Sequence, residues 1–278
     1  MAKRAMVIND LSSFGRCSLT AYIAVLSAMG HTPCPLPTAV LSAQSEFPDY
    51  FGMELTDAIP EYKKAWQKNH ESFDGISTGY FANSRQLDHA ADIINAFRTE
   101  ESAVLVDPVM GDNGSLYPDY DKACCAKMKQ LISAADVITP NLTELCLLTD
   151  TPYADLTAHS AEQGYFERIT ALAKQIMRPL GVIVTGIRSG GDVCNLAVTG
   201  DEARIFRCKN AGESFSGTGD IFSAVVFGCI LSCKTLFDAA QLATDFVERS
   251  IADTVKEPHD PLYGVNFEKF LTILEEVK

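Results

Sequence analysis

The residues best suited to chemistry form a glycine-rich segment directly ahead of an apolar helical stretch. The segment ends in Ser216-Gly217-Thr218-Gly219-Asp220. Glycines before a helix let the backbone approach a ligand closely, and the first N–H groups and the helix dipole attract an anion. The segment therefore predicts an anion site built without Lys or Arg. The alternative is an ordinary helix cap, with Ser216 or Thr218 as the cap residue and Asp220 as a partner of the dipole.

Asp220 would place a carboxylate in the first helical turn, facing the same point as these N–H groups. In phosphoryl transfer, a carboxylate can accept the proton of an attacking hydroxyl while N–H groups stabilise the charge on the transferring phosphoryl oxygens. The segment therefore predicts a kinase that acts on a small alcohol. Neither the Walker sequence G-x-x-x-x-G-K-[ST] nor the fingerprint G-x-G-x-x-G occurs in the chain. Neither a P-loop nor a dinucleotide-binding fold is therefore indicated.

Short β-branched runs alternate with longer amphipathic stretches, and this alternation predicts the elements that position the segment. Strands separated by helices imply crossover connections, hence an α/β fold with a mainly parallel central sheet and helices on both faces. The last two strands, joined through Thr199-Gly200-Asp201, predict an antiparallel hairpin at the sheet edge. The expected strands are 5–8, 75–78, 103–106, 137–139, 182–185, 193–198 and 203–208. The expected helices are 18–29, 56–68, 84–97, 121–133, 142–149, 161–177, 220–233, 236–253 and 266–277.

The length of 278 residues and the apolar content of 47% suit one large globular domain over residues 1–278. The sequence shows no internal repeat, low-complexity tract or long linker. The extended segment 33–53 is rich in Pro and polar residues, so it can form a small flap instead of core.

Polar residues follow five of the predicted strands, at the end where open α/β sheets bind their ligands. Any one of them would also fit an ordinary strand end or helix cap. Five at the same end of one sheet favour a binding site. They are Asn9-Asp10, Thr78-Gly79-Tyr80, Asp107-Pro108, Asn141 and Thr185-Gly186.

The charge balance argues against one class of partner. Lys and Arg number 23 and Asp and Glu 36, and the formal net charge of −13 has the wrong sign for binding a nucleic acid backbone. An acidic protein that handles phosphate needs positive charge from Mg²⁺, helix N-termini or backbone N–H groups. The nine cysteines are odd in number and scattered, as reduced core thiols are. The N-terminus has too few apolar residues for a signal peptide or a spanning helix, so we expect a cytoplasmic protein without a membrane partner.

Three motifs, at these separations and in this order, resemble those of the ribokinase-like superfamily: Asp107-Pro108-Val109-Met110-Gly111-Asp112, Thr139-Pro140-Asn141-x-x-Glu144 and Gly217-Thr218-Gly219-Asp220. Leu36-Pro37-Thr38 and Thr78-Gly79-Tyr80 narrow the resemblance to the vitamin B6 kinases, and it extends over nearly the whole chain. The resemblance implies a three-layer ribokinase-like fold and a homodimer. It also implies ATP-dependent phosphorylation of the 5′-hydroxymethyl group of pyridoxal, pyridoxine or pyridoxamine, which gives pyridoxal 5′-phosphate or its analogue.

The resemblance assigns the transfer chemistry to the glycine-rich segment. Asp220 would be the base that takes the proton of the hydroxymethyl group, and the amides of Gly217, Thr218 and Gly219 would hold the γ-phosphate. Thr185 would contact a phosphate oxygen. We expect the adenine pocket from the edge hairpin and the 217–250 region.

The resemblance also implies where the ATP phosphates and metal ions bind. Asn141 and Glu144 would lie near the phosphates and Mg²⁺, with Glu144 acting through metal-bound water. Asp107 would help to place the phosphates or their metal. Asp112 and Thr139 resemble the places where such kinases hold a monovalent cation, in this case K⁺.

Some residues expected to bind the vitamer match those of the B6 kinases, and others differ from them. Thr38 and Tyr80 match positions that line the pyridine ring, where an aromatic face and a hydroxyl suit a flat heteroaromatic ligand. Family members commonly have Ser where this chain has Asp10, and some have a His after the Leu-Pro-Thr segment, where this chain has Ser42-Ala43-Gln44-Ser45. A carboxylate at position 10 can bond the ring hydroxyl or the protonated ring nitrogen, which would favour a cationic or amine-bearing vitamer.

Three other functions are left open by the sequence. A hydroxymethylpyrimidine kinase of thiamin synthesis uses the same hydroxymethyl geometry, but such enzymes typically open with a Gly-Ser-Asp-x-Ser-Gly-Gly-Ala-Gly-like run that residues 9–15 do not reproduce. A vitamer-binding protein without activity would not need Asp220. Residues 75–79 have the G-x-S-x-G spacing of a hydrolase with His259 downstream, but their short apolar strand favours a buried Ser77 bonded to backbone.

Overall fold

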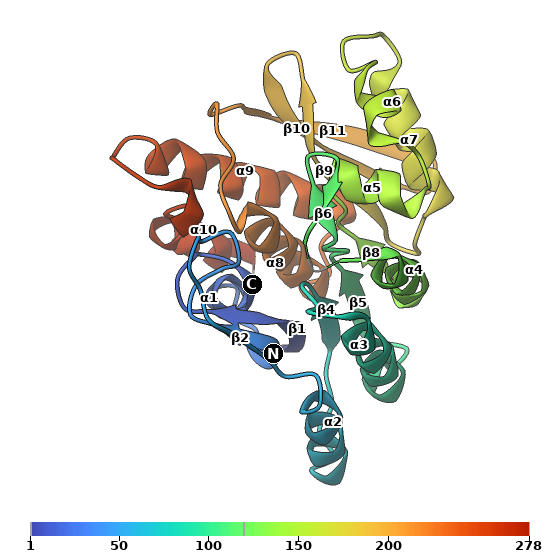
Figure 1. Ribbon diagram of the computed structural model, residues 1–278, viewed down its shortest axis with the longest axis vertical. Helices are drawn as coiled ribbons and strands as arrows, with labels where there is room; N and C mark the ends of the chain where they lie inside the picture. Colours follow the sequence, from blue (N-terminus) through green and yellow to red (C-terminus); the bar gives the residue numbers. More distant parts are fainter. Residues whose placement is uncertain (1, 119, 278) are drawn as a thin grey trace.

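The computed structural model describes residues 2–118 and 120–277, and the predicted strands form one sheet through its centre (Figure 1). Within the described residues this sheet has nine strands in the order β11-β10-β9-β8-β5-β4-β1-β2-β3. They are β1 (Arg4–Ser12), β2 (Thr32–Leu41), β3 (Gly52–Glu54), β4 (Gly75–Thr78), β5 (Ala103–Val106), β8 (Val137–Ile138), β9 (Gly181–Ser189), β10 (Asp192–Thr199) and β11 (Glu202–Lys209). A separate small hairpin pairs β6 (Gly111–Asp112) with β7 (Ser115–Leu116).

The strands pair in parallel from β2 across to β9 and antiparallel at both margins. β1 pairs in parallel with β2 and β4, and the parallel pairs β4-β5, β5-β8 and β8-β9 continue the sheet. β10 pairs antiparallel with both β9 and β11. The mainly parallel sheet and its antiparallel edge hairpin are therefore confirmed. At the opposite edge, β3 pairs antiparallel with β2.

Alternate residues of the central strands bury their side chains on opposite faces of the sheet. Met6 and Ile8 of β1 belong to one hydrophobic core and Ala5 and Val7 to the other. Both faces of each parallel strand are thus buried, which explains the nearly continuous apolar runs in the sequence. The first core contains residues of α2 (Ile59–Lys68), α3 (Ser84–Phe97), α4 (Lys122–Leu131), α5 (Leu142–Leu148), α6 (Tyr153–Thr157) and α7 (Tyr165–Gln175). The second contains residues of α1 (Ser18–Ala28), α8 (Thr218–Leu231), α9 (Leu236–Thr254) and α10 (Leu271–Leu274), which completes the predicted three layers.

The first strand is longer than expected, and an additional strand, β2, forms in the segment expected to be a flap. β1 continues past Ile8, where its pairing with β4 ends, because β2 still pairs with it as far as Ser12. Asn9 and Asp10 therefore lie within β1 instead of after it. Residues 33–41 of the expected flap 33–53 belong to β2 and residues 52–53 to β3, so the part outside the sheet shortens to the loop 42–51. The prolines of β2 are tolerated because its pairing with β3 starts at Ala39, which leaves the preceding residues on a sheet edge.

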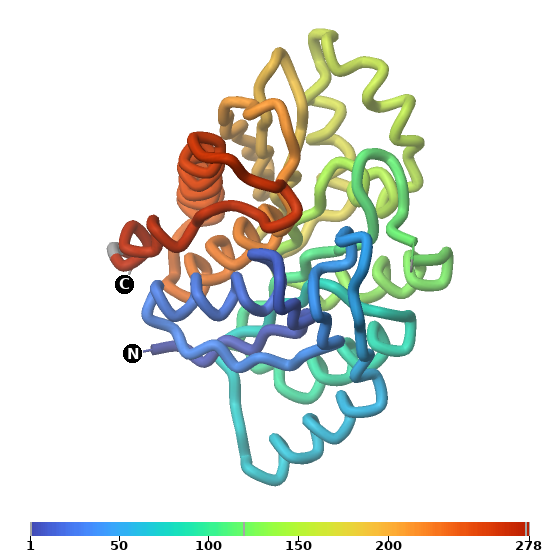
Figure 2. Tube along the Cα trace, turned by 60° about the vertical axis from the view of Figure 1, so that its left-hand side comes forward, coloured from blue at the N-terminus to red at the C-terminus, as the bar shows by residue number. Residues whose placement is uncertain are grey.

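The C-terminal segment also differs from the expectation. The predicted helix 266–277 is divided into 3₁₀ turns and the short helix α10. The Asn266 N–H donates to the Thr254 hydroxyl at the end of α9 (2.8 Å), which ties the start of this segment to α9. α10 packs against α1, so the two ends of the chain lie on the same side of the molecule (Figure 2). In the ranges that the structure describes, no helix combines the length and apolar character needed to cross a bilayer.

Candidate active site

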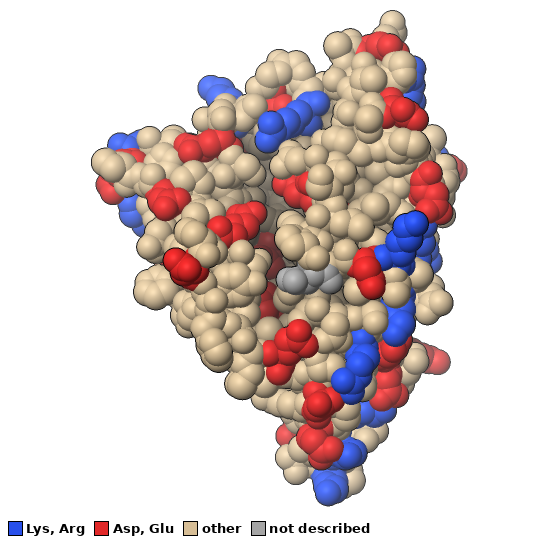
Figure 3. Space-filling model, viewed as in Figure 1, with Lys and Arg blue, Asp and Glu red and all other residues tan. Residues whose placement is uncertain are grey.

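The strand ends and the start of α8 enclose a cleft, visible in the space-filling view as a hollow flanked by acidic side chains (Figure 3). Its inner cavity of about 510 Å³ shares several lining residues with an outer cavity of about 640 Å³. The strand-end residues meet here, as their positions in a parallel sheet predict. Ten of the predicted site residues line the inner cavity: Asp10, Tyr80, Asp107, Thr139, Asn141, Glu144, Thr185, Gly217, Gly219 and Asp220.

The start of α8 has the geometry of an anion site. Gly217 is the N-cap, with φ of +77°, and in the described structure no side chain caps this helix end. The Thr218 hydroxyl donates instead to the Phe215 carbonyl (3.1 Å), so the cap interpretation with Ser216 or Thr218 is wrong. A Cβ at position 217 would clash with the Arg16 carbonyl oxygen, so glycine is required here for space as well as for its φ.

Asp220 projects from the first turn of α8 into the inner cavity, where a second side chain orients it. Asn9 donates from Nδ2 to Asp220 Oδ1 (2.9 Å). The Asn9 Oδ1 atom accepts the N–H groups of Asp10 (2.9 Å) and Tyr80 (2.8 Å), which fixes its amide orientation. Burial raises the pKa of Asp220 to about 6, the charge of Asp10 adds to the rise, and hydrogen bonds from the Ser18 N–H and Asn9 oppose it. A carboxylate that titrates near neutral pH suits a general base.

Asp10 brings a second carboxylate into the inner cavity beside Asp220. It is buried in β1, and its Oδ2 atom accepts the Ser12 hydroxyl proton (2.7 Å). Burial raises the pKa of Asp10, and hydrogen bonds from Ser18 and Ser12 partly offset this rise. Asp10 therefore offers a buried negative charge at the position where we expected the vitamer ring.

Asp107 follows β5 and forms a hydrogen-bonded group with residues of two other elements. Its Oδ2 atom accepts the Ser223 hydroxyl proton from α8 (2.9 Å), and the Ser223 Oγ lies 2.9 Å from the Thr139 hydroxyl after β8. Burial and then the charge of Asp220 raise the pKa of Asp107 to about 8, against the hydrogen bonds from Ser223 and Thr139.

Asn141 and Glu144 cap α5 reciprocally while they face the cavity. The Asn141 side chain accepts the Glu144 N–H (2.9 Å), and Glu144 Oε2 accepts the Asn141 N–H (2.8 Å). Glu144 Oε1 accepts the Met110 N–H (3.1 Å), so both carboxylate oxygens already hold backbone donors. Burial, and next the charge of Asp107, raise the pKa of Glu144. Within the described residues, no three His, Cys, Asp or Glu side chains gather as a ready-made metal site.

Two predicted site residues, Thr38 and Asp112, do not line the inner cavity. Thr38 does not line the described cavities: it is fully buried, and its hydroxyl donates to the Tyr80 carbonyl (2.9 Å). It supports Tyr80 instead of contacting a ligand. Asp112 lines the outer cavity and accepts two hydrogen bonds from Asn113, whereas Thr139 lines the inner cavity. The two cavities share Asn141 and Thr185 in their linings.

The outer cavity contains residues that sequence analysis did not identify. Its wall is apolar where β10, β11 and α9 meet, and Asn195 donates from Nδ2 to the Thr244 hydroxyl in this wall (2.9 Å). A flat heteroaromatic group fits such a wall. These side chains follow the ordinary pattern of a buried strand or helix face, so the sequence gives no signal that separates them from core. They are Val193, Asn195, Cys208, Thr244, Val247 and Ile251.

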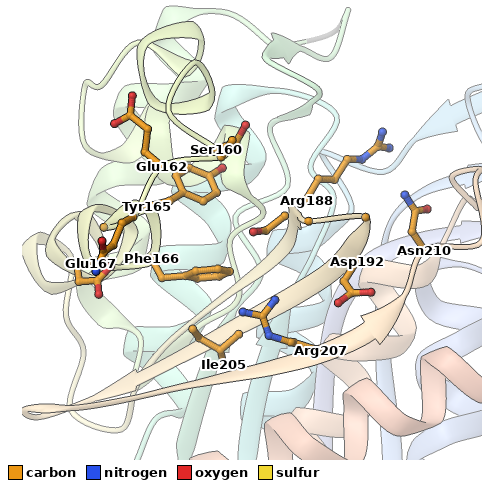
Figure 4. Close-up of a pocket in the computed structure, with 16 residues that line it drawn as sticks. Ser160, Glu162, Tyr165, Phe166, Glu167, Arg188, Asp192, Ile205, Arg207 and Asn210 are labelled. Atoms are coloured by element: carbon orange, nitrogen blue, oxygen red, sulfur yellow. The ribbon is translucent and has the colours of Figure 1, made fainter.

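A shallow groove of about 800 Å³ extends the outer cavity to the edge of the sheet (Figure 4). The Arg207 guanidinium lies 5.4 Å from the centre of the Phe166 ring across this groove. Arg188 lines both the groove and the outer cavity, so it places a positive charge at their junction. Positive charge at this end of the cleft suits a phosphate-bearing ligand.

The hydrolase alternative does not fit the structure. Ser77 lies inside β4, fully buried, and not on the strand-to-helix turn that a nucleophile needs. Its hydroxyl donates to the Tyr22 hydroxyl (3.1 Å) and not, as predicted, to backbone. His259 is bonded to Glu213 and to the Glu257 carbonyl near the surface.

This fold and this site define the chain as a kinase of the ribokinase-like class. The chain belongs to the phosphomethylpyrimidine kinase family, whose model matches residues 21–262. It is similar over 99% of its length to a Bacteroides thetaiotaomicron protein with the provisional designation phosphomethylpyrimidine kinase, at 36% identity, 94% coverage of that chain and a TM-score of 0.93. A second crystal form of a protein with that designation from the same organism contains pyridoxal (35% identity, TM-score 0.91, covering 99% of this chain and 96% of that one).

Two further relatives carry the name of a B6 kinase. The pyridoxal kinase of Lactobacillus plantarum is 25% identical, with a TM-score of 0.88 and coverage of 99% of this chain and 97% of that one. The pyridoxine/pyridoxal/pyridoxamine kinase of Bordetella avium is 28% identical over 240 residues, which cover 82% of this chain and 78% of the relative.

Proposed function

We propose that this protein transfers the γ-phosphoryl group of ATP to the 5′-hydroxymethyl group of a B6 vitamer. The observation that carries the proposal is the pairing of Asp220, whose pKa is raised to about 6, with the uncapped N-terminus of α8 at the inner cavity. The pyridoxal found with a similar protein and the names of the two B6 kinases support the vitamer as acceptor.

In this proposal, phosphoryl transfer takes place at the inner cavity, and the adenine ring of ATP lies in the outer cavity. Asp220, oriented by Asn9, accepts the proton of the hydroxymethyl group as that oxygen attacks phosphorus. The N–H groups of Gly217, Thr218 and Gly219 hold the transferring phosphoryl oxygens, and this stabilisation is largest where charge develops. The adenine ring lies against the apolar wall of the outer cavity, with Thr185 between the two cavities at a phosphate.

Mg²⁺ accompanies ATP in this proposal, and it would supply positive charge at the phosphate oxygens. The donor set fits, because Asp107 and Glu144 offer the hard oxygen atoms that Mg²⁺ prefers. Both Glu144 oxygens already accept backbone N–H groups, which favours contact through metal-bound water. In this proposal Asp112, which lines the outer cavity, and Thr139, which lines the inner one, would hold K⁺.

The vitamer ring lies in the inner cavity, beside Tyr80, Tyr117 and Val109. Asp10 faces the ring and bonds its hydroxyl or its protonated nitrogen. The proposal further includes one kinase domain over residues 1–278, a homodimer and a cytoplasmic location.

A coupled ATP-consumption assay with pyridoxal, pyridoxine, pyridoxamine and hydroxymethylpyrimidine tests the function. We expect turnover with the B6 vitamers and a loss of about 10²–10⁴ in kcat for Asp220→Asn, because removal of a general base affects the transition state most. ADP binding by calorimetry should persist in Asp220→Asn. Wild-type turnover that Asp220→Asn does not reduce would sink the assignment of the base.

Hydroxymethylpyrimidine kinase is the second candidate, because the matching family model has a phosphomethylpyrimidine kinase description. It uses the same base and anion site on a similar ring. The ratio of kcat/KM for hydroxymethylpyrimidine to that for the best vitamer decides between the two, and a ratio above one would favour the pyrimidine.

A further inference from the structure

The Ser223 hydroxyl donates its proton outside its own helix, whereas the buried hydroxyls of α9 donate within theirs. Ser250 and Thr254 of α9 each donate to the carbonyl four residues earlier in their own helix. Ser223, which is 1% exposed on the otherwise apolar inner part of α8, bonds outside its helix, to Asp107 after β5 and Thr139 after β8. A buried hydroxyl needs such partners to offset its desolvation. This hydroxyl links three separate elements at the cleft.

The hydrogen bonds of this group have one direction when Asp107 is ionised. An ionised carboxylate accepts but cannot donate, so Ser223 gives its single proton to Asp107. Thr139 must then donate to Ser223 across their 2.9 Å separation. The hydroxyl of Ser223 therefore stabilises the charge of Asp107 and fixes the orientation of the Thr139 side chain.

The position of Ser223 in α8 connects this group to the base. Ser223 follows Asp220 by three residues, so both side chains lie on the same side of the helix, one turn apart. Tyr22 of α1 lies beside the same group, and its hydroxyl accepts the Ser77 hydroxyl proton (3.1 Å). Movement of the first turns of α8 away from the strand ends would break the hydrogen bonds of Ser223.

We propose that Ser223 is a positioning residue for phosphoryl transfer: its hydroxyl holds the turn of α8 that carries Asp220 at a fixed separation from Asp107 and Thr139. The inference rests on the proposed kinase function and names a residue that acts through these partners without touching substrate. Reacting groups must be held closely, since a misplacement of roughly 1 Å can cost about 100-fold in rate.

The test compares Ser223→Ala with the matched control Ser250→Ala, which deletes an equally buried helical hydroxyl that bonds within its own helix. We expect Ser223→Ala to lower kcat about 10- to 100-fold, as for the loss of a hydrogen bond to a charged group. The KM values for ATP and vitamer and the Kd of ADP should stay within about threefold, because Ser223 is only 1% exposed and contributes little surface to the inner cavity that it lines. Ser250→Ala should keep kcat within about twofold at a similar change in Tm.

A second variant keeps the proposal testable if Ser223→Ala does not fold. Thr139→Val removes the donor to Ser223 with little change in shape, and the double variant with Ser223→Ala should lose little more than either single variant. An unchanged kcat in Ser223→Ala, an equal loss in Ser250→Ala, or fully additive losses in the double variant would each overturn the positioning role. A wild-type protein inert toward every alcohol would overturn the proposed function and this inference with it, whereas an active wild type with an unaffected Ser223→Ala overturns this inference alone.

Discussion

Four carboxylates share the inner cavity, and burial raises the pKa of each of them: Asp10, Asp107, Glu144 and Asp220. Like charges at close range oppose one another's ionisation, so a proton binds more readily here than at the surface. Such a cluster is costly for folding and useful for chemistry, because a base that is half ionised near neutral pH both accepts and releases a proton readily.

The pH dependence of turnover should reveal Asp220. Its carboxylate must be ionised to accept the alcohol proton, and its pKa is raised to about 6. The kcat/KM should therefore fall as the pH is lowered through this value. Asn9→Ala removes a hydrogen bond that favours the ionised form, so the acid limb should move to higher pH. Profiles between pH 5 and 8 for both proteins measure this, and a profile that is flat to pH 5 would contradict the role of Asp220.

Asp10 should control which vitamer is preferred. Its buried charge favours a cationic or amine-bearing ring substituent. We expect Asp10→Ser to lower kcat/KM for pyridoxamine relative to pyridoxal by about tenfold, the effect of one charge-assisted hydrogen bond. Ser12→Ala is the control, because it removes the hydrogen bond to Asp10 and leaves the charge in place. Equal relative kcat/KM values in wild type and Asp10→Ser would eliminate the idea.

At the scale of elements, the N-terminus of α8 depends on the backbone of Gly217. Gly217→Ala combines a φ of +77° with a clash against the Arg16 carbonyl, so the helix start must shift. We expect a loss of stability of about 1–3 kcal/mol and an increase in KM for ATP, since the anion site moves with the helix start. Thermal unfolding and steady-state kinetics measure both effects.

Gly200→Ala is the control for this prediction. Gly200 has a φ of +55° in the turn between β10 and β11, and a Cβ there would meet open space. The substitution should therefore cost some stability through backbone strain alone and leave the KM for ATP unchanged. An unaltered KM in Gly217→Ala, or an equal rise in both variants, would argue against an anion site at α8.

The elements predicted best from the sequence are those in which burial imposes a clear pattern of apolar and polar residues. Strand 103–106 and helix 84–97 agree with β5 and α3 to the residue, because each has a continuous apolar run or face bounded by polar residues. Strand 75–78 agrees with β4 to the residue as well. The hairpin β6-β7 and the helix α6 are too short to show a period, and they are missing from the prediction.

In the candidate site, too, the sequence reveals residues at regular positions such as strand ends, and it misses roles that depend on tertiary packing. Polar residues at strand ends are visible in sequence, so Asp107, Asn141 and Thr185 could be identified. Thr38 follows a strand-like run too, yet its hydroxyl turns toward the Tyr80 carbonyl, a choice that tertiary packing decides. Ser223 stands inside an apolar helix, where sequence alone cannot distinguish a cross-element hydrogen bond from one to the helix backbone.

At the scale of the whole molecule, the net charge of −13 and the buried carboxylates act in the same direction. Both favour proton binding to the folded chain over the pH range around neutrality. Among the described cations, Arg188 and Lys209 line the outer cavity, at the far end from Asp10 and Asp220. These two side chains add positive charge to the cavity that the proposed function gives to the nucleotide, and they do not line the inner cavity.

Buried carboxylates should make the ligand-free protein more stable in mild acid than in mild alkali. The pKa values of Asp220 (about 6) and Asp107 (about 8) exceed the value of about 3.9 for an unfolded Asp, so the folded state binds more protons in between. Stability must then decrease as the pH rises through this range. We expect a higher Tm at pH 6.5 than at pH 8. His31, whose pKa is lowered, opposes the trend chiefly below the value of about 6.5 for an unfolded His, so it contributes little over most of this window.

Asp107→Asn tests the cause of this pH dependence. The neutral amide removes a buried charge, so Tm at pH 8 should rise above that of wild type by roughly 2–4 °C for each kcal/mol gained, with a smaller difference at pH 6.5. The same variant should lose at least about tenfold in kcat, because in the proposed function Asp107 helps to place the phosphates or their metal. Asp57→Asn, at an exposed ion pair with Arg85, should leave the pH dependence of Tm unchanged. A lower Tm for Asp107→Asn than for wild type at pH 8 would mean that the hydrogen bonds to this carboxylate stabilise the folded state more than the burial of its charge destabilises it. The proposed cause of the pH dependence would then be wrong.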